Sequence, residues 1–202
     1  MPDWDKRYRE KDAALFGNAP NEYLREILAR SDFAAKSALC LADGDGRNGR
    51  WLAGLGIRVT GVDLSGVARE IAVRRDAEAG VEVERIAADL AVWEPDAARV
   101  WDAAFMIYLH CEREVRQVAV QRAGARIMPG GWFVAEGFAV SRPEGNLMGP
   151  DDTNLLYDTA ELRAWLPGFQ VVEALTGTLL LEEGRRHRGE AHVVRFAARR
   201  AA

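Results

Sequence analysis

Short apolar runs alternate with helix-like segments along most of this chain, and the alternation limits the folds open to it. The expected strands cover residues 37–42, 58–62, 81–87, 102–109 and 132–138, and the expected helices cover residues 47–55, 65–79 and 112–128. Strands that are joined through a helix normally run parallel in one sheet. The sequence therefore predicts an α/β fold with a doubly wound, mostly parallel sheet and helices on both faces.

The tail of the chain departs from this alternation. Residues 169–175, 178–182 and 190–197 are strand-like, and residues 184–189 resemble a turn. Because no helix fits between the last two strand-like runs, we expect them to pair antiparallel as a hairpin. The sheet should therefore end in an antiparallel pair of strands.

The front of the chain has a different composition. Aromatic and charged residues mix over the first twenty positions without a clear period, and residues 21–30 are expected to form one amphipathic helix. We expect residues 1–30 to form either a cap on the sheet or a lid over it. A chain of 202 residues ordinarily forms one domain, so the expected unit spans residues 1–202.

Charge and composition argue against several classes of protein. The 27 basic and 31 acidic residues give a net charge of −4, which does not suit a surface that neutralises nucleic-acid phosphates. No apolar run approaches the ~18 residues that a membrane span needs, and the start lacks the apolar stretch of a signal peptide. Two cysteines are too few for a disulfide framework. We expect a cytoplasmic monomer or homodimer with no nucleic-acid or membrane partner.

The loop after the first expected strand carries the most informative pattern. Gly44, Gly46 and Gly49 form a G-x-G-x-x-G pattern between a strand and a helix, which favours a dinucleotide such as NAD. Asp43 and Asp45 lie in the same loop, however, and would repel a pyrophosphate. S-adenosylmethionine (SAM) has an ammonium and a sulfonium and no phosphate, so it suits a negative loop. We expect Asp43 near the ammonium and the amides of the helix start near the carboxylate.

Two further acids follow the next two expected strands. Asp63 lies 20 residues after Asp43, a spacing at which a carboxylate accepts the ribose hydroxyls of a nucleoside. The alternative is that Asp63 caps the next helix, although Ser65 can do so itself. Asp89 is a candidate to bind an adenine amino group while Leu90 packs on the ring. The three acids should line the carboxyl edge of the sheet, where open α/β sheets bind ligands.

With these motifs in place, the chain resembles the class I SAM-dependent methyltransferases. The resemblance is carried, in the family's order and spacing, by residues 39–48 (LCLADGDGRN), 62–65 (VDLS), 88–90 (ADL) and 127–131 (IMPGG). Two positions depart from the family pattern, since Ala42 stands where the first glycine is usual and Cys40 where an acid is usual. The resemblance implies a seven-stranded, Rossmann-like methyltransferase fold whose last strand is antiparallel.

A closer resemblance involves both ends of the chain. Residues 4–8 (WDKRY), 16–17, 20–21 and 183–189 are similar to the tellurite-resistance and thiopurine-type methyltransferases. This resemblance favours a small-molecule methyl acceptor that is soft or oxyanionic, such as tellurite, selenite or a thiol. A thiolate, selenite or tellurite needs no general base, whereas an alcohol or an amine needs one.

The expected site has a cofactor side and an acceptor side. The residues expected to bind SAM are Asp43, Gly44, Asp45, Gly46, Arg47, Asn48, Asp63, Leu64, Ala88, Asp89, Leu90 and Tyr108. On the acceptor side we expect His110, which follows the fourth strand, together with His187 and Arg188 on the closing hairpin. The alternatives are that His110 merely closes its strand, and that the charged turn, with Arg185 and Arg186, is only solvated.

Two other functions stay open at this point. One is an NAD-dependent oxidoreductase, which the glycine pattern and Asp63 favour. The other is a SAM-binding module without catalytic activity. The three histidines form no ligand pair such as H-x-x-x-H, so we expect no metal.

Overall fold

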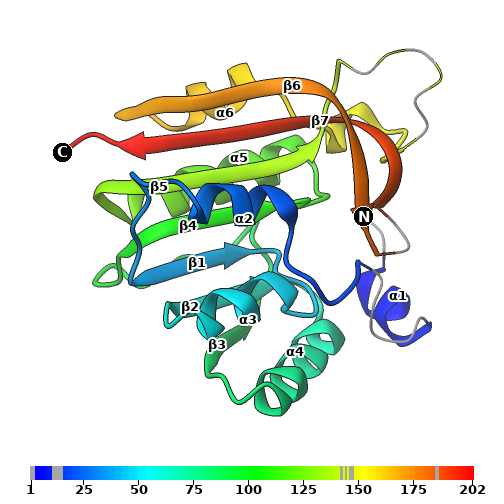
Figure 1. Cartoon of the computed structure of the whole chain (residues 1–202), viewed down its shortest axis with the longest axis vertical. Coiled ribbons are helices and arrows are strands. Elements are labelled where there is room, and N and C mark those ends of the chain that lie inside the picture. The colour runs from blue at the N-terminus through cyan, green and yellow to red at the C-terminus, as the bar shows by residue number, and fades with distance from the viewer. Residues whose placement is uncertain (1–2, 11–15, 142, 144, 146–147, 185–186) are drawn as a thin grey trace.

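The computed structural model describes residues 3–10, 16–141, 143, 145, 148–184 and 187–202. They contain a seven-stranded sheet with the strand order β3-β2-β1-β4-β5-β7-β6 (Figure 1). The strands are β1 (Ser37–Leu41), β2 (Arg58–Asp63), β3 (Val83–Ala87), β4 (Trp101–Ile107), β5 (Ile127–Phe138), β6 (Phe169–Glu183) and β7 (His187–Arg200). The helices are α1 (Trp4–Glu10), α2 (Glu22–Leu28), α3 (Arg47–Gly54), α4 (Gly66–Glu78), α5 (Arg113–Ala125), the 3₁₀ helix η1 (Thr153–Leu155) and α6 (Thr159–Trp165).

The strand directions follow from the alternation in the sequence. The strands β1 to β5 run parallel. β7 lies between β5 and β6 and runs antiparallel to both. The predicted fold class, a doubly wound and mostly parallel sheet with an antiparallel hairpin at its end, is confirmed.

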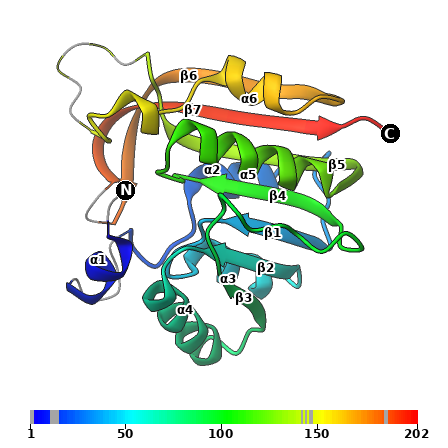
Figure 2. The same cartoon turned by 180° about the vertical axis from the view of Figure 1, so that it is seen from behind.

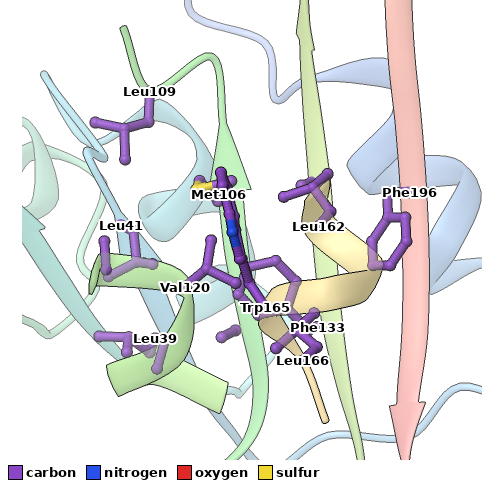
Figure 3. Packing of buried hydrophobic residues seen from close by; sticks show 14 of the residues in the cluster. Leu39, Leu41, Met106, Leu109, Val120, Phe133, Leu162, Trp165, Leu166 and Phe196 are labelled. Atoms are coloured by element: carbon purple, nitrogen blue, oxygen red, sulfur yellow. The ribbon is translucent and has the colours of Figure 1, made fainter. Parts of the chain in front are cut away.

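Two hydrophobic cores lie on opposite faces of the sheet, because successive strand residues point to opposite sides. On β1, Leu39 and Leu41 belong to the core under α5 and α6, whereas Ala38 and Cys40 belong to the core under α2 and α3. Figure 3 shows the first core, where Trp165 of α6 packs among strand residues. The two helix layers are seen from opposite sides in Figures 1 and 2.

Short polar side chains begin several of the helices. Asn21 Oδ1 accepts a hydrogen bond from the N–H of Leu24 at 3.0 Å and caps α2. Ser65 Oγ accepts from the N–H of Ala68 at 3.0 Å and caps α4. Such caps satisfy backbone donors that the first helical turn leaves unpaired. They fix where the helices next to the sheet edge begin.

Some elements differ from the prediction. β4 ends at Ile107, so Tyr108 and Leu109 lie beyond the strand. The runs 169–175 and 178–182 form one continuous strand, because the residues between them pair with β7 without interruption. Helices α1 and α6 have no counterpart in the prediction. None of the helices in the described part of the chain is long and apolar enough to span a membrane.

Candidate functional site

The loop between β1 and α3 turns sharply at the carboxyl edge of the sheet. Ala42, Gly44 and Gly46 have positive φ angles of 53°, 56° and 82°. Glycine adopts such angles easily, whereas Ala42 carries strain there, which explains why glycine is usual at that position. Gly46 precedes α3, and no side chain caps this end of the helix. This sharp turn therefore allows a ligand to approach the backbone of the loop closely.

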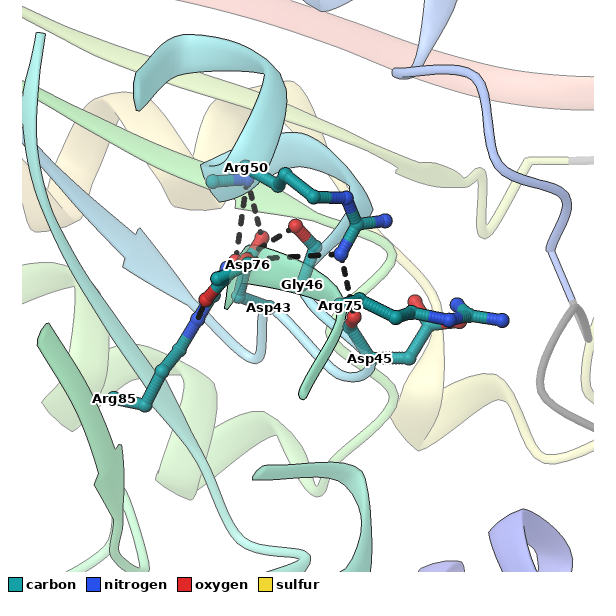
Figure 4. A network of polar contacts seen from close by, with 8 residues as sticks. Asp43, Asp45, Gly46, Arg50, Arg75, Asp76 and Arg85 are labelled. Atoms are coloured by element: carbon teal, nitrogen blue, oxygen red, sulfur yellow. Dashed lines mark hydrogen bonds and ion pairs between the residues drawn. The ribbon is translucent and has the colours of Figure 1, made fainter. Parts of the chain in front are cut away.

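A buried ion network supports this loop from below (Figure 4). Arg85 of β3, whose side chain is 3% exposed, donates to the carboxylate of Asp43. It also donates to the two carboxylate oxygens of Asp76 at 2.8 and 3.1 Å and to the Gly46 carbonyl at 3.2 Å. Asp43 accepts as well from the N–H of Gly49 at 3.2 Å. The Asp43 carboxylate therefore has a buried partner in Arg85, and its expected place beside a ligand ammonium stays a prediction.

The second acid of the loop is also neutralised. Asp45 is buried, and Arg75 Nη1 lies 2.6 Å from its Oδ2. Both acids of the loop are therefore paired with arginines, which reduces the negative charge that the loop presents to a ligand. The expectation that this charge distinguishes SAM from a dinucleotide stays a prediction. No local pattern in the sequence signals this pairing, because Arg75 and Arg85 lie 30 and 42 positions away from their partners.

Asp63 stands at the end of β2, directly against the loop. Its Oδ2 accepts from the N–H of Gly44 at 2.8 Å, and its Oδ1 accepts from the N–H of Ser65 at 2.9 Å. Ser65 itself caps α4, so the alternative that Asp63 is the helix cap does not hold. Burial raises the pKa of Asp63 to about 6, although both hydrogen bonds oppose the shift.

These elements surround a pocket with about 840 Å³ of space between its atoms, its open mouth included. Ten residues of the expected SAM-binding set line it, namely Asp43, Gly44, Asp45, Arg47, Asn48, Asp63, Leu64, Asp89, Leu90 and Tyr108. Gly46 and Ala88 belong to the expected set and do not line the pocket. Most other wall residues are apolar or aromatic, and they include Trp4, Tyr8, Phe16, Ile107, Leu109 and Val115.

One end of the pocket consists of aromatic rings around two histidines. His187, at the start of β7, is buried, and its ring centroid lies 4.2 Å from that of Tyr108 and 5.0 Å from that of Phe16. His110 stacks on Phe138 with ring centroids 5.6 Å apart. Neither histidine Nδ1 has a hydrogen-bond partner among the described residues.

Both imidazoles are neutral at physiological pH. Burial lowers the pKa of His110 to about 4 and that of His187 to about 3, and the charges of Arg7 and Arg47, respectively, add to the shift. The two histidines also line a second cavity, which opens toward Arg7 and residues 149–152. They therefore stand between the two cavities.

Other expected residues lie elsewhere. Arg188 is exposed and lines neither cavity, so its expected role on the acceptor side has no support in the geometry. Arg185 and Arg186 lie outside the described residues. Cys111 is buried, and burial raises its pKa to about 12, which suits a packing role. Within the described ranges, no group of three or more His, Cys, Asp and Glu side chains is placed to hold a metal ion.

Trp4 and Tyr8 belong to the front segment that is expected to cap or cover the sheet, and both line the pocket. They lie one helical turn apart on α1, with ring centroids 6.2 Å apart. The contribution of Arg85 to this site was not predicted. Arg85 is the one buried residue of β3. An arginine at the inward position of a short strand is the corresponding signal, because a buried arginine requires acidic partners.

Comparison with known proteins shows which family part of this chain resembles. Residues 38–131, from β1 into β5, match the family model of a methyltransferase domain. The matched stretch makes up just under half of the chain. A search of curated protein sequences finds no match to the chain.

Several solved structures share the fold of this chain. One comes from a study of the conversion of a disulfide bond into a thioacetal group during echinomycin biosynthesis; it is 20% identical, covers 98% of this chain and 90% of that chain, and has a TM-score of 0.72. TehB from Haemophilus influenzae is 15% identical over 89% of this chain and 61% of that chain, with a TM-score of 0.71. Magnesium protoporphyrin IX methyltransferase (ChlM) from Synechocystis PCC 6803 with bound SAM is 15% identical over 89% and 77%, with a TM-score of 0.63. The fold is the Rossmann-like methyltransferase fold.

The Synechocystis methyltransferase structure holds SAM, and the residues of the pocket described above fit this cofactor. The Asp63 carboxylate can only accept hydrogen bonds when ionised, and the ribose diol offers two donors. Leu90, Leu109 and Val115 supply an apolar wall suited to adenine. The uncapped start of α3 presents backbone N–H groups suited to the carboxylate of SAM.

Proposed function

We propose that this chain is a SAM-dependent methyltransferase that acts on a soft or oxyanionic small molecule, such as a thiolate, selenite or tellurite, which binds beside His110 and His187. The observation that carries the proposal is the pair of buried imidazoles between the two cavities, each with an unpartnered Nδ1 among the described residues. A neutral imidazole offers one N–H donor and one nitrogen acceptor. It can therefore orient an acceptor without adding charge.

The protonation state of these histidines restricts the acceptor. A general base works best when its pKa lies near the working pH. With pKa values of about 4 and about 3, His110 and His187 are weak bases that suit neither an alcohol nor an amine. The acceptor must then bring its own reactive lone pair, as thiolates and the oxyanions of selenium and tellurium do.

The chain's contribution to the reaction is position and exclusion of water. SAM supplies a methyl group on a sulfonium, whose charge is lost as the acceptor attacks. Asp63 would hold the ribose, and the rings of Phe16, Tyr108 and Phe138 surround the histidine end of the pocket with apolar surface. Removing water from such a site strengthens the remaining electrostatic contacts. Fixed geometry of this kind accounts for a large share of the rate in a displacement.

A screen of methyl acceptors tests the proposal. Purified protein is incubated with methyl-labelled SAM and selenite, tellurite, alkyl and aryl thiols, phenols and amines, and labelled products are quantified. We expect transfer to one of the soft or oxyanionic acceptors. The variants His110→Phe and His187→Phe should each lower kcat/KM about five- to tenfold, as for one lost hydrogen bond, whereas Arg188→Gln should match the parent. Transfer to phenols or amines alone would contradict the proposal.

The same experiments address the two alternatives. The antiparallel β7 between β5 and β6 departs from the parallel order 3-2-1-4-5-6 of dinucleotide-binding sheets. Calorimetry with SAM and with NAD should give heat only for SAM, and tight binding of NAD alone would favour the oxidoreductase. SAM binding without turnover on any acceptor would favour a binding module.

A further inference from the structure

Two parts of the chain that are far apart in sequence meet over the histidine end of the pocket. They are residues 16–22, called the front segment below, and Glu183, Gly184 and His187. Together they form what we call the roof. Phe16 lies on His187, and the backbones of Gly17 and Gly184 touch so closely that a Cβ on Gly17 would lie 3.2 Å from the N atom of Gly184. A Cβ on Gly184 would collide with the backbone of Phe16 and Gly17. The front segment therefore rests directly on the end of β6.

Glu183, the last residue of β6, accepts several hydrogen bonds across this contact. One of its oxygens, Oε1, accepts from Asn21 Nδ2 and from the N–H of Glu22, both at 2.9 Å. The other, Oε2, accepts from Arg47 Nη2 at 2.6 Å. Arg47 also donates from Nη1 to the carbonyl of Ala19 at 3.0 Å. One carboxylate thus ties together the front segment, the start of α3 and the hairpin.

Glu183 also affects the position of His187. Glu183 and His187 face each other as paired residues of β6 and β7. The position of the Glu183 backbone therefore determines where the His187 ring enters the pocket. Because the side chains of Glu183 and Arg47 are only 12% and 7% exposed, their pairing carries a large desolvation cost. Such a pair contributes more to a unique geometry than to net stability.

We propose that Glu183 is a positioning residue that fixes His187 and the front segment as one roof over the pocket. The functional meaning of this inference rests on the proposed function, which places His187 on the acceptor side. Glu183 acts through His187 and through Phe16. It orders the wall against which the acceptor lies.

The ring of His187 reports on the roof directly. The chain contains only three histidines, so imidazole NMR of the labelled protein resolves each of them, with His187→Phe as the assignment variant. Glu183→Ala should release the roof, admit water and raise the pKa of His187 by about two units or more, toward its usual ~6.5. If Glu183 mattered only as a charge, its loss would leave Arg47 uncompensated and lower the pKa of His187 instead. The two explanations therefore predict opposite signs.

Matched variants separate the roof from general effects on β6. Glu182→Ala removes the exposed neighbouring carboxylate and should leave His187 unchanged. Gly184→Ala pushes the front segment away without removing a charge, so it should also raise the pKa of His187. Gly177→Ala places a Cβ in open space on the same strand and serves as its control. Glu183→Gln keeps the shape of the side chain and should give a smaller rise, which provides a reading if the alanine variant does not fold.

A His187 pKa that stays low in folded Glu183→Ala, Glu183→Gln and Gly184→Ala would overturn the inference. His192, on β7 outside the pocket, should not respond to any of the variants. The measurement uses the protein without an acceptor. A failed acceptor screen therefore leaves this result intact, and an unchanged His187 leaves the proposed function intact.

Discussion

Asp63 keeps its charge at neutral pH at a cost to the folded protein. Burial raises its pKa from 3.8 to about 6, a difference worth about 3 kcal/mol. The folded protein holds this proton more tightly than the unfolded chain does. The Asp63 contribution to stability therefore falls as the pH rises from about 4 to about 6. A ligand that donates hydrogen bonds to the buried Asp63 carboxylate would therefore stabilise its ionised form.

SAM binding should depend on the ionisation of Asp63. We expect SAM affinity to fall as the pH drops through about 6 and to approach a tenfold loss per pH unit below it, because the protonated acid is a poorer acceptor. Asp63→Ala should weaken binding at pH 7.5 by ~1.5–3 kcal/mol, as for a lost charge-assisted hydrogen bond. Calorimetric titration between pH 5 and pH 8 measures both. A pH profile that persists in the alanine variant would assign it to another group.

Individual residues also show where sequence reasoning stops. Asp63, with its strand-end position and its spacing from the glycine loop, could be found because its context is local. The environment of Asp43 could not, because its partner Arg85 comes from another strand and carries no local signal. The sequence pattern places both acids at the sheet edge, and both line the pocket, but only the fold shows that Asp43 is also paired with Arg85.

Helix α3 contains two glycines that face different surroundings. A Cβ on Gly49 would collide with Asp43 Oδ2 and press on Arg85, whereas a Cβ on Gly54 would meet no atom within 4 Å. The ion network beneath the loop therefore leaves no room for a side chain on Gly49. Gly54 has no such constraint.

Alanine substitutions in α3 should therefore have opposite effects. Gly54→Ala should stabilise the fold by up to about 1 kcal/mol through helix propensity. Gly49→Ala should destabilise it by about 1–3 kcal/mol, the usual range for overpacking, and should weaken SAM binding because the loop shifts. Urea unfolding and calorimetry of the two variants provide the measurements. Equal behaviour of the two glycines would show that the network can move aside without cost.

Among the elements, the central strands, their helices and α2 were predictable, whereas α1 and α6 were not. β1, β4 and β5 contain apolar runs of a length typical of buried strands. α2 has seven residues and four large apolar side chains, whereas α1 and α6, of the same length, have only two apiece. Their formation depends on tertiary contacts, such as the packing of Tyr8 against α4 and the burial of Trp165 under the sheet.

Over the whole molecule, two buried neutral histidines should make the protein acid-sensitive. Their pKa values in the folded state lie below the ~6.5 of an unfolded chain, so the unfolded chain binds more protons between pH 6.5 and pH 4. Stability is full above pH 6.5 and is lost as the pH falls below it. Between pH 6.5 and pH 5 each histidine should cost about 2 kcal/mol, and protonation of Asp63 offsets about 1 kcal/mol of the total.

Urea unfolding at pH 7 and pH 5 measures this loss. The double variant His110→Phe/His187→Phe should reverse the pH dependence and be about 1 kcal/mol more stable at pH 5 than at pH 7, because Asp63 still takes up a proton. The single variant His187→Phe should lose only about 1 kcal/mol, because protonation of Asp63 offsets part of the cost of His110. A parent protein equally stable at both pH values would contradict the burial of the two imidazoles.

The meeting of Gly17 with Gly184 has a consequence for how the molecule is assembled. The front segment is synthesised first, yet the surface on which it rests belongs to the last hairpin. Contacts between such distant parts of a chain form slowly, because a large loop has to close, at a cost in entropy, before the contacts can stabilise the fold. The part of the pocket wall that residues 42–115 form therefore needs only the first four strands, whereas the histidine end of the pocket is complete only when β6 has paired with β7.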